Sequence, residues 1–360
     1  MDQPDERTSI IAFDVGGANI KAADGLGWTR SEPFPLWQRP DELPAVLARM
    51  AADYAQQQAR GETLRRIVAT MTGEIADCYP SRRVGVQQIT AALAAAAAAS
   101  APPAELGVYL VDGTIVPAAV AAGRTLDAAA SNWHAVARLG AAYATSDRAF
   151  VVDIGSTTTD IIPIRDGRPA ACGRDDVGRL AVGELVYTGV ERTPVAALVR
   201  SLPWAGGPDT SPRLRPIASE RYADSRDVWL LLGGLPEDPG SRDTADGGPA
   251  TRDGARVRMA RMLLADPDDF SWAAAEAAAD WCAAAQGRLV ARAVARVAKA
   301  CGWRPTSLVL SGHGDCLARR SLARLGWEVP TVVLPDILGP DVSRAAPAHA
   351  VAMIARGMLA

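Results

Sequence analysis

Residues 9–23 read SIIAFDVGGANIKAA, and this stretch decides the fold. A mostly apolar run leads to Asp14, two glycines follow, and a second apolar stretch begins at Ile20. Apolar runs of this kind predict a buried strand, and the glycine pair predicts a tight turn into a return strand. We therefore expect a β-hairpin with Asp14 at the end of its first strand.

The same pattern returns at residues 149–164, which read AFVVDIGSTTTDIIPI. Asp153 ends the apolar run, and a glycine and four Ser or Thr residues follow before the return strand begins. A repeated unit indicates two similar halves that face each other. We place the first half at residues 1–147 and the second at residues 148–360.

The remaining sequence alternates predicted helices and strands, which is typical of an α/β fold. Helices are predicted at residues 41–60, 81–101, 125–143, 256–265, 270–302, 316–325 and 343–358. Further strands are predicted at residues 64–71, 108–111, 307–310 and 331–334. Residues from about 203 to 265 are rich in Gly, Pro, Asp and Arg in their first part, and we interpret them as a loop-rich, partly helical insertion in the second half.

Composition excludes several classes of protein. The chain has 360 residues, is 49% hydrophobic and carries a net charge of -3. These values exclude disorder over most of the length and argue against binding dominated by nucleic-acid phosphates or an anionic membrane. The five cysteines include no C-x-x-C pair, and the longest apolar run, residues 91–99, is too short to span a bilayer. We expect a soluble cytoplasmic protein with reduced thiols.

The two Asp-x-Gly turns predict a site for phosphate and a divalent cation. Glycine has no Cβ, so backbone N–H groups can approach an anion closely. A carboxylate at a strand end can hold Mg²⁺ directly or through water, and Lys21 can add a positive charge. The candidate metal ligands are Asp14 and Asp153. The candidate phosphate-binding residues in the turns are Gly16, Gly17, Asn19, Gly155, Ser156, Thr157 and Thr158.

A third glycine-rich element, SGHGD at residues 311–315, follows a predicted strand and precedes a predicted helix. This position suits a ligand at a helix N-terminus. Gly312, His313 and Gly314 are therefore further candidates for phosphate binding.

In order along the chain, these three elements resemble the phosphate-1, phosphate-2 and adenosine loops of the actin, hexokinase and Hsp70 ATPase-like superfold. The resemblance implies two ribonuclease-H-like halves around a central cleft. Within that superfold the chain looks like the hydantoinase/oxoprolinase-related group. Eight strings lie in order between residues 10 and 315 and together resemble the tetrahydromethanopterin-linked C1-transfer pathway proteins and the methylofuran-biosynthesis synthases. They are IIAFDVGGANIKAA, MTGEIADC, ASNWHAVA, VVDIGSTTTDIIPI, GELVYTGVERTP, DVWLLLGGLPED, DTADGGP and LSGHGD.

The closer resemblance implies a transferase. The phenol oxygen of γ-glutamyltyramine would displace pyrophosphate from an aminomethyl-furan-methanol diphosphate and form an ether, with help from Mg²⁺ and without ATP. The candidate catalytic residues are Asp153, Glu74, Asp77, Asp160 and Lys21, and the general base is left open among Glu74, Asp77 and Asp160. The candidate substrate-binding residues are Asn132, Trp133, Tyr187, Thr188 and Arg192, of which Arg192 could bind a glutamyl carboxylate.

Two other functions fit the same motifs. One is an ATP-dependent small-molecule kinase or hydantoinase/oxoprolinase-type ATPase, in which the loops would hold ATP. The other is a non-catalytic nucleotide-binding protein. We expect small-molecule partners, no nucleic acid and no membrane, and leave a homodimer open.

Overall fold

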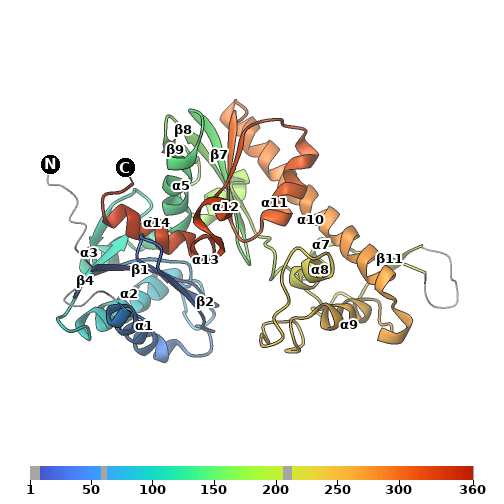
Figure 1. The fold of residues 1–360 in the computed structure, drawn as a ribbon, viewed down its shortest axis with the longest axis horizontal. Coiled ribbons are helices and arrows are strands. Elements are labelled where there is room, and N and C mark those ends of the chain that lie inside the picture. Colours follow the sequence, from blue (N-terminus) through green and yellow to red (C-terminus); the bar gives the residue numbers. More distant parts are fainter. Residues whose placement is uncertain (1–8, 58–62, 206–212, 360) are drawn as a thin grey trace.

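Two mixed β-sheets form the frame of the molecule in a computed structural model that describes residues 9–57, 63–205 and 213–359 (Figure 1). The first sheet has the strand order β3-β2-β1-β4-β5-β6, and the second has the order β10-β8-β7-β13-β14. In each sheet the leading strand pairs antiparallel with its hairpin partner and parallel with the strand on its other side. The predicted α/β fold with two similar halves is confirmed by this shared topology.

The first sheet and the helices beside it come from the first part of the chain. Its strands are β1 (Ser9–Val15), β2 (Asn19–Ala23), β3 (Thr29–Pro33), β4 (Leu64–Met71), β5 (Glu105–Tyr109) and β6 (Ile115–Pro117). The helices are α1 (Leu43–Gln57), α2 (Arg82–Ala98), α3 (Ala118–Gly123) and α4 (Thr125–Ala128), and a 3-10 turn (Pro40–Glu42) precedes α1.

The second sheet repeats the arrangement with longer connections. Its strands are β7 (Arg148–Ile154), β8 (Thr159–Arg165), β10 (Leu185–Val186), β13 (Ser307–Gly312) and β14 (Thr331–Val333), and the short β9 (Arg168–Pro169) also pairs with β8. The helices are α6 (Asp176–Val182), α10 (Trp272–Cys301), α11 (Asp315–Leu322), α12 (Leu334–Leu338) and α13 (Pro340–Arg344), with a 3-10 turn (Ala323–Leu325) after α11.

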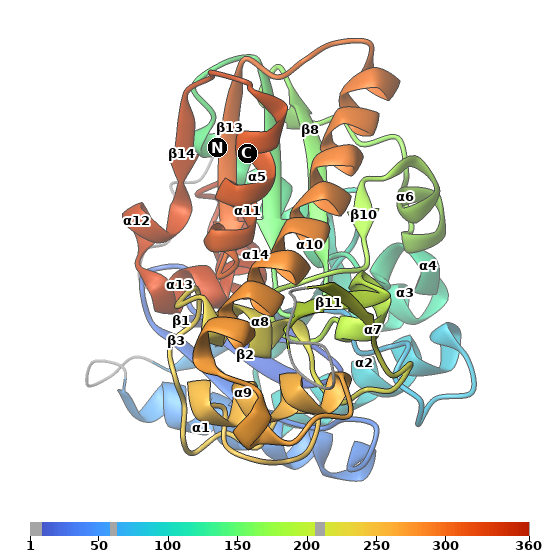
Figure 2. The same cartoon turned by 90° about the vertical axis from the view of Figure 1, so that its right-hand side faces the viewer.

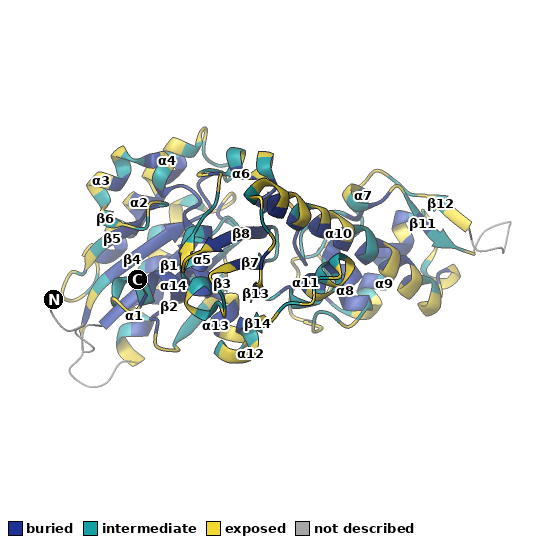
Figure 3. Ribbon diagram, turned by 90° about the horizontal axis from the view of Figure 1, so that it is seen from above, coloured by how far each residue is buried: buried dark blue, intermediate teal, exposed yellow. Residues whose placement is uncertain are grey.

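Both leading strands are buried on both faces, which explains their unbroken apolar sequence. Because side chains alternate along a strand, Ile11 and Phe13 of β1 pack toward α1 and α2, whereas Ile10 and Ala12 face the middle of the molecule. Figure 3 shows β1, β4, β7 and β8 as a buried centre with exposed helices around it.

Two helices fill the space between the sheets. They are α5 (Asn132–Tyr143) and α14 (Ala346–Ala355), and both contribute to one core with the inner faces of the two sheets (Figure 1). Alanines at 346, 348, 350 and 352 keep α14 narrow enough to pack against β1, β4 and α5. The predicted division at residues 147/148 precedes β7 and stays a prediction, and α14 lies beyond it in sequence while it packs against the first sheet.

Residues of the predicted insertion form an accessory lobe, which we define as the described residues between 195 and 271. The lobe contains α7 (Val195–Leu198), β11 (Ser201–Trp204), β12 (Arg213–Pro216), α8 (Ser225–Leu231), α9 (Arg252–Met262) and a 3-10 turn (Pro267–Asp269). Helix α10 has 30 residues, and its length follows from the rise of 1.5 Å per residue of an α-helix. It reaches from this lobe along the outer face of the second sheet (Figure 2). Trp229, Met259 and Phe270 join the lobe to the core beneath α10.

The predicted single helix at residues 125–143 is wrong. The structure has two helices, α4 and α5, separated at Ala130, which adopts a positive φ of 47°. This backbone conformation cannot continue a right-handed helix. In the described part of the chain no helix is both long enough and apolar enough to cross a membrane.

Candidate active site

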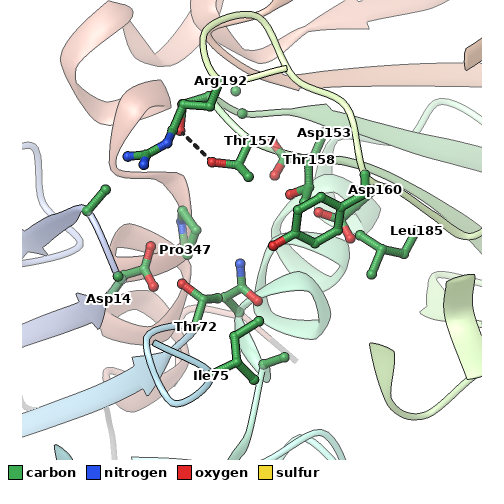
Figure 4. Close-up of a pocket in the computed structure, with 18 of the residues that line it drawn as sticks. Asp14, Thr72, Ile75, Asp153, Thr157, Thr158, Asp160, Leu185, Arg192 and Pro347 are labelled. Carbon is green, nitrogen blue, oxygen red and sulfur yellow. Dashed lines mark hydrogen bonds between the residues drawn. The ribbon is translucent and has the colours of Figure 1, made fainter. Parts of the chain in front are cut away.

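A cavity of about 450 Å³ lies between the two halves, and this volume is in the range of small-molecule sites. It brings together most of the candidate residues, from both hairpins and from the third glycine-rich loop. Those that line it are Asp14, Gly17, Lys21, Glu74, Asp77, Asn132, Asp153, Gly155, Ser156, Thr157, Thr158, Asp160, Tyr187, Arg192, Gly312 and His313. In Figure 4 Asp14 approaches from one side and Asp153, Thr157 and Asp160 from another.

Five candidates do not line the cavity: Gly16, Asn19, Trp133, Thr188 and Gly314. Trp133 is buried beneath the Arg179 guanidinium, which lies 4.1 Å from the centroid of its ring. The buried Thr188 hydroxyl contacts Thr193 at 2.9 Å and accepts a hydrogen bond from Gln286. These two side chains therefore make packing contacts and do not line the cavity.

The two hairpin turns close in the same way. The Gly16 N–H donates to the Asn19 carbonyl at 3.0 Å, and the Gly155 N–H donates to the Thr158 carbonyl at 3.0 Å. Gly16 and Asn19 thus shape the first turn without lining the cavity, whereas Gly155 and Thr158 of the second turn do line it. A Cβ on Gly16 would lie only 2.8 Å from the Asn19 oxygen, so the turn needs glycine there.

The buried surroundings of Asp14 and Asp153 disfavour the charged forms of both carboxyl groups. The Oδ1 atom of each is buried and has no hydrogen-bond partner. Burial raises the pKa of Asp14, an effect that Lys21 partly offsets from 3.9 Å. Burial and the neighbouring Asp160 carboxylate raise the pKa of Asp153 to about 6, and the charge of Asp14 adds to this rise. The charge of Asp14 thus disfavours ionisation of Asp153, and a bound cation would offset this effect.

The carboxylates of Asp14 and Asp153 suit Mg²⁺, which does not need a site built entirely from protein ligands. Among the described residues no group of three or more His, Cys, Asp or Glu side chains is arranged to hold a metal. Mg²⁺ usually takes only one or two carboxylates and completes its shell with water and substrate phosphates. Two buried carboxylate oxygens without partners, at a cavity lined by residues of both hairpin turns, match this pattern.

Asp160 is held in a buried ion pair. It is the cross-strand partner of Asp153, and the Arg179 guanidinium donates to its Oδ1 at 2.7 Å. Both side chains of this ion pair are almost fully buried. In the first hairpin the cross-strand partner of Asp14 is Lys21. Arg179 therefore supplies to the second hairpin the positive charge that Lys21 supplies to the first.

Glu74 is the carboxylate best placed to accept a proton. It lies in the loop after β4, lines the cavity and has 1% of its side chain exposed, and both of its oxygens lack a hydrogen bond of normal geometry. Burial raises the pKa of Glu74 to about 7. Asp77, the third candidate, lies in the same loop and is exposed.

Glu74 is held in place by the first turn of α2. A Cβ on Gly85 would lie 2.1 Å from the Glu74 carbonyl oxygen, so only glycine allows this approach. We expect Gly85→Ala to lower the free energy of unfolding by about 1–3 kcal/mol, because backbone must move to relieve the overlap. Urea unfolding measures this loss.

Gly123→Ala is the matched control for this substitution. A Cβ there meets nothing within 4 Å, and the residue lies at the end of helix α3. The free energy of unfolding should stay the same or rise, because alanine favours helix. Equal stability of the Gly85 and Gly123 variants would contradict the proposed contact.

Arg192 reaches the cavity because its backbone is fixed to the second hairpin. The N–H groups of Glu191 and Arg192 both donate to the Ser156 carbonyl at 3.0 Å. Gly189 lies against the same turn, where a Cβ would be 2.5 Å from the Gly155 oxygen. The Arg192 guanidinium lies 5.7 Å from the ring centroid of Trp37 in the first half, and its Nη1 is buried without a partner. An anionic group in the cavity would satisfy this nitrogen.

The glycines of the third loop allow it to approach β7 closely. A Cβ on Gly312 would lie 2.2 Å from the Ile154 oxygen, and one on Gly314 would lie 2.3 Å from the Ile154 side chain. His313 Nε2 lies 3.1 Å from Glu191. Burial opposes ionisation of Glu191, but His313 and Arg226 outweigh it and lower the Glu191 pKa to about 2. A low pKa favours the ionised Glu191 carboxylate, which accepts hydrogen bonds, and this is consistent with donation from His313 Nε2.

Sequence reasoning missed several residues of the cavity. They are Trp37, Thr72, Asp176, Arg179 and Arg344, together with apolar contacts such as Ile75, Leu185 and Pro347. Thr72 follows β4 directly and could have been found by extending the rule that polar residues at strand ends meet at one edge. Asp176, Arg179 and Arg344 lie on short helices whose position depends on tertiary packing, and no local pattern marks them.

Known proteins resemble this chain over most of its length. Residues 65–356 match the hydantoinase/oxoprolinase family. A protein from Methanocaldococcus jannaschii, named (4-{4-[2-(γ-L-glutamylamino)ethyl]phenoxymethyl}furan-2-yl)methanamine synthase, is 29% identical over 97% of this chain and 98% of its own length. A protein of the same name from Methanococcus vannielii is 31% identical over 58% of this chain and 91% of its own length.

Among solved structures, nucleotide-free acetone carboxylase matches 96% of this chain and 70% of its own chain, with 12% identity and a TM-score of 0.49. Component A of (R)-2-hydroxyglutaryl-CoA dehydratase from Acidaminococcus fermentans matches 98% of each chain, with 13% identity and a TM-score of 0.46. The family match covers far more than half of the sequence and includes the second hairpin, the third glycine-rich loop and Glu74. The chain therefore belongs to the hydantoinase/oxoprolinase family.

Proposed function

We propose that this protein is a transferase that forms the aryl ether of a methylofuran precursor. The phenol oxygen of γ-glutamyltyramine attacks the CH₂ carbon of an aminomethyl-furan-methanol diphosphate. The new C–O bond replaces the C–O bond to the diphosphate, and pyrophosphate leaves. The observation that carries this proposal is the similarity, over 97% of the chain, to a synthase whose name describes such a phenoxymethyl-furan product.

The hairpins are proposed to hold the diphosphate. Ser156, Thr157 and Thr158 provide hydroxyl groups at the cavity wall, and Lys21 provides a positive charge. Asp14 and Asp153 would hold a divalent cation, which supplies positive charge against the departing phosphate oxygens. Turns of the kind that bind a nucleotide's phosphates in related folds would here bind the diphosphate leaving group.

Glu74 is proposed to take the phenol proton. A phenol has an ordinary pKa of about 10, so a carboxylate with a pKa raised to about 7 is a better acceptor than an exposed one. The electron-rich furan stabilises positive charge on its CH₂ group, and bond breaking can therefore run ahead of attack. This lowers the demand on the base and is consistent with a carboxylate in that role.

The test is a product assay. The protein, Mg²⁺, the furan diphosphate and γ-glutamyltyramine are incubated without ATP, and pyrophosphate and the ether product are measured together. Equal amounts of both products are the expected result. Absence of the ether by mass spectrometry would overturn the proposal. Formation of ADP when ATP is supplied instead of the furan diphosphate would favour the ATPase alternative.

Arg192 is proposed to bind the glutamyl carboxylate. We expect Arg192→Ala to raise KM for γ-glutamyltyramine by about 30-fold and to change kcat much less, since a charge-assisted hydrogen bond contributes about 2 kcal/mol. Steady-state kinetics measure both constants. Tyramine, which lacks the glutamyl group, is the control substrate, and an equal rise of KM on tyramine would place the carboxylate elsewhere.

We further propose the cytoplasm as the location of this activity. Homodimer formation stays a prediction.

A further inference from the structure

One ion pair joins the two halves at the edge of the cavity. Arg82 is the first residue of α2, beside the first sheet, and Asp176 is the first residue of α6, beside the second. Arg82 Nη2 donates to Asp176 Oδ2 at 3.0 Å. About a quarter of each side chain is exposed (24% and 23%), so water partly screens the pair.

Glu74 lies directly beside this ion pair. Arg82 Nε is 3.9 Å from Glu74 Oε1, which is too far for a hydrogen bond. Arg82 thus has two acidic neighbours and hydrogen-bonds only the one from the opposite half. The Glu74 carboxylate is left buried at the cavity, and no side chain among the described residues donates a hydrogen bond to it.

The other charged groups around Glu74 are few. Asp77 lies in its own loop and is exposed. Arg179 and Asp160, whose charges act on Asp176, form a separate ion pair in the second half. The positive charge that approaches Glu74 within 4.0 Å among the described residues is that of Arg82.

We propose that the Arg82–Asp176 ion pair is a positioning device for Glu74: while the halves are together it holds the Arg82 guanidinium in a hydrogen bond to Asp176, so that Arg82 comes no closer to Glu74 than 3.9 Å and the Glu74 carboxylate can accept the substrate proton. If the pair is broken, Arg82 can move the short distance to Glu74 and neutralise it. Glu74 can therefore act as the base only when α6 and α2 are in contact. This inference rests on the proposed function insofar as Glu74 acts as the base.

Electrostatics supports the same geometry. After burial, the charge of Asp176 also raises the Glu74 pKa, whereas the charge of Arg82 lowers it. The two members of one ion pair therefore act on Glu74 in opposite directions. A purely structural role, in which the pair only holds the halves together, has no such asymmetry, because losing either member would admit water and lower the Glu74 pKa.

The experiment measures Glu74 without substrate. The protein is labelled with ¹³C at the glutamate carboxyl carbons and titrated by NMR, and the Glu74 signal is identified by its absence in Glu74→Gln. We expect Asp176→Asn to lower the Glu74 pKa by about one pH unit and Arg82→Gln to raise it by about one unit. The double variant should return close to the wild-type value, and Arg83→Gln, which removes a neighbouring exposed arginine, should leave it unchanged.

Shifts in the same direction for both single variants, or no shift in either, would overturn the inference. Circular dichroism and the remaining glutamate signals establish that each variant is folded, and Arg82→Lys, which keeps the charge, replaces Arg82→Gln as the comparison if that variant unfolds: it should leave the Glu74 pKa near the wild-type value. The titration needs no turnover, so its outcome is independent of the ether assay. If ether forms, the acid limb of its pH profile should move with the measured pKa in each variant.

Discussion

Replacing Asp153 by Asn should lower the rate of ether formation at least about 100-fold while leaving the protein as stable as the wild type or more stable. The rate falls because one contact to developing charge on the leaving group is worth about 3 kcal/mol. Stability does not fall because the buried Oδ1 of Asp153 has no hydrogen-bond partner, and its pKa is already raised by burial and by Asp160. Stopped assays of pyrophosphate and urea unfolding at pH 8 measure the two effects.

The sign of the stability effect follows from proton linkage. A carboxyl whose pKa is higher in the folded than in the unfolded state stabilises the fold most at low pH, and that contribution is lost as pH rises through about 6. Asn removes the charge and therefore removes this loss at pH 8. Asp14→Asn should behave in the same way, since its Oδ1 is also buried and unpartnered.

Asp24→Ala is the matched control for a buried aspartate outside the cavity. Oδ1 of Asp24 accepts hydrogen bonds from the N–H groups of Leu26 and Trp28 at 2.7 and 3.1 Å. Its loss should cost about 1–3 kcal/mol of unfolding free energy and leave the chemical step unchanged. Near wild-type turnover in both the Asp14 and Asp153 variants would remove the proposed cation site from the mechanism.

Replacing Glu74 by Gln should lower kcat about 100-fold and abolish the acid limb of the pH profile. The wild-type rate should rise with pH and level off above about 7, because only the ionised carboxylate accepts the phenol proton. Gln cannot ionise, so the residual rate of the variant should not change between pH 5 and 8. Initial rates of ether formation over that range measure the effect.

Stability provides a second measurement on the same variant. The folded-state pKa of Glu74 is raised to about 7, so its contribution to stability is largest below the unfolded value of 4.5 and is lost as pH rises through 7. The Gln variant should therefore be at least as stable as the wild type at pH 8. A pH limb near 7 that survives in the Gln variant would assign the base to another group, and Asp77 would be tested next.

Much of the fold could be predicted because its determinants are local. The run from Ser9 to Phe13 and the one from Ala149 to Val152 place apolar residues on both faces, so their burial follows from composition. Each is followed by a turn that contains glycine, and the structure shows both turns closed by the same backbone bond. A Cβ would collide with the backbone at Gly16 but not at Gly155. The prediction of one helix at residues 125–143 was wrong because Ala130 has a positive φ. An alanine in the sequence does not indicate this backbone conformation.

Most of the candidate site could be predicted for the same reason. Polar residues at the ends of adjacent strands meet at one edge of a sheet, so Asp14, Glu74 and Asp153 had to approach the same space once the two sheets faced each other. Trp133 and Thr188 were chosen from strings that resemble a family, and a string does not state which side chains point inward. Both face packed surroundings away from the cavity.

The sequence by itself determined the two hairpins, their aspartates and the α/β alternation, because each depends on neighbours within a few residues. Tertiary structure alone decided which charges meet. The Arg82–Asp176 pair joins residues 94 positions apart, and the return of α14 to the first sheet joins the last helix to the first strand. No local preference encodes such contacts, since they form only when the packed sheets bring short helices with unrelated sequences to the same edge of one cavity.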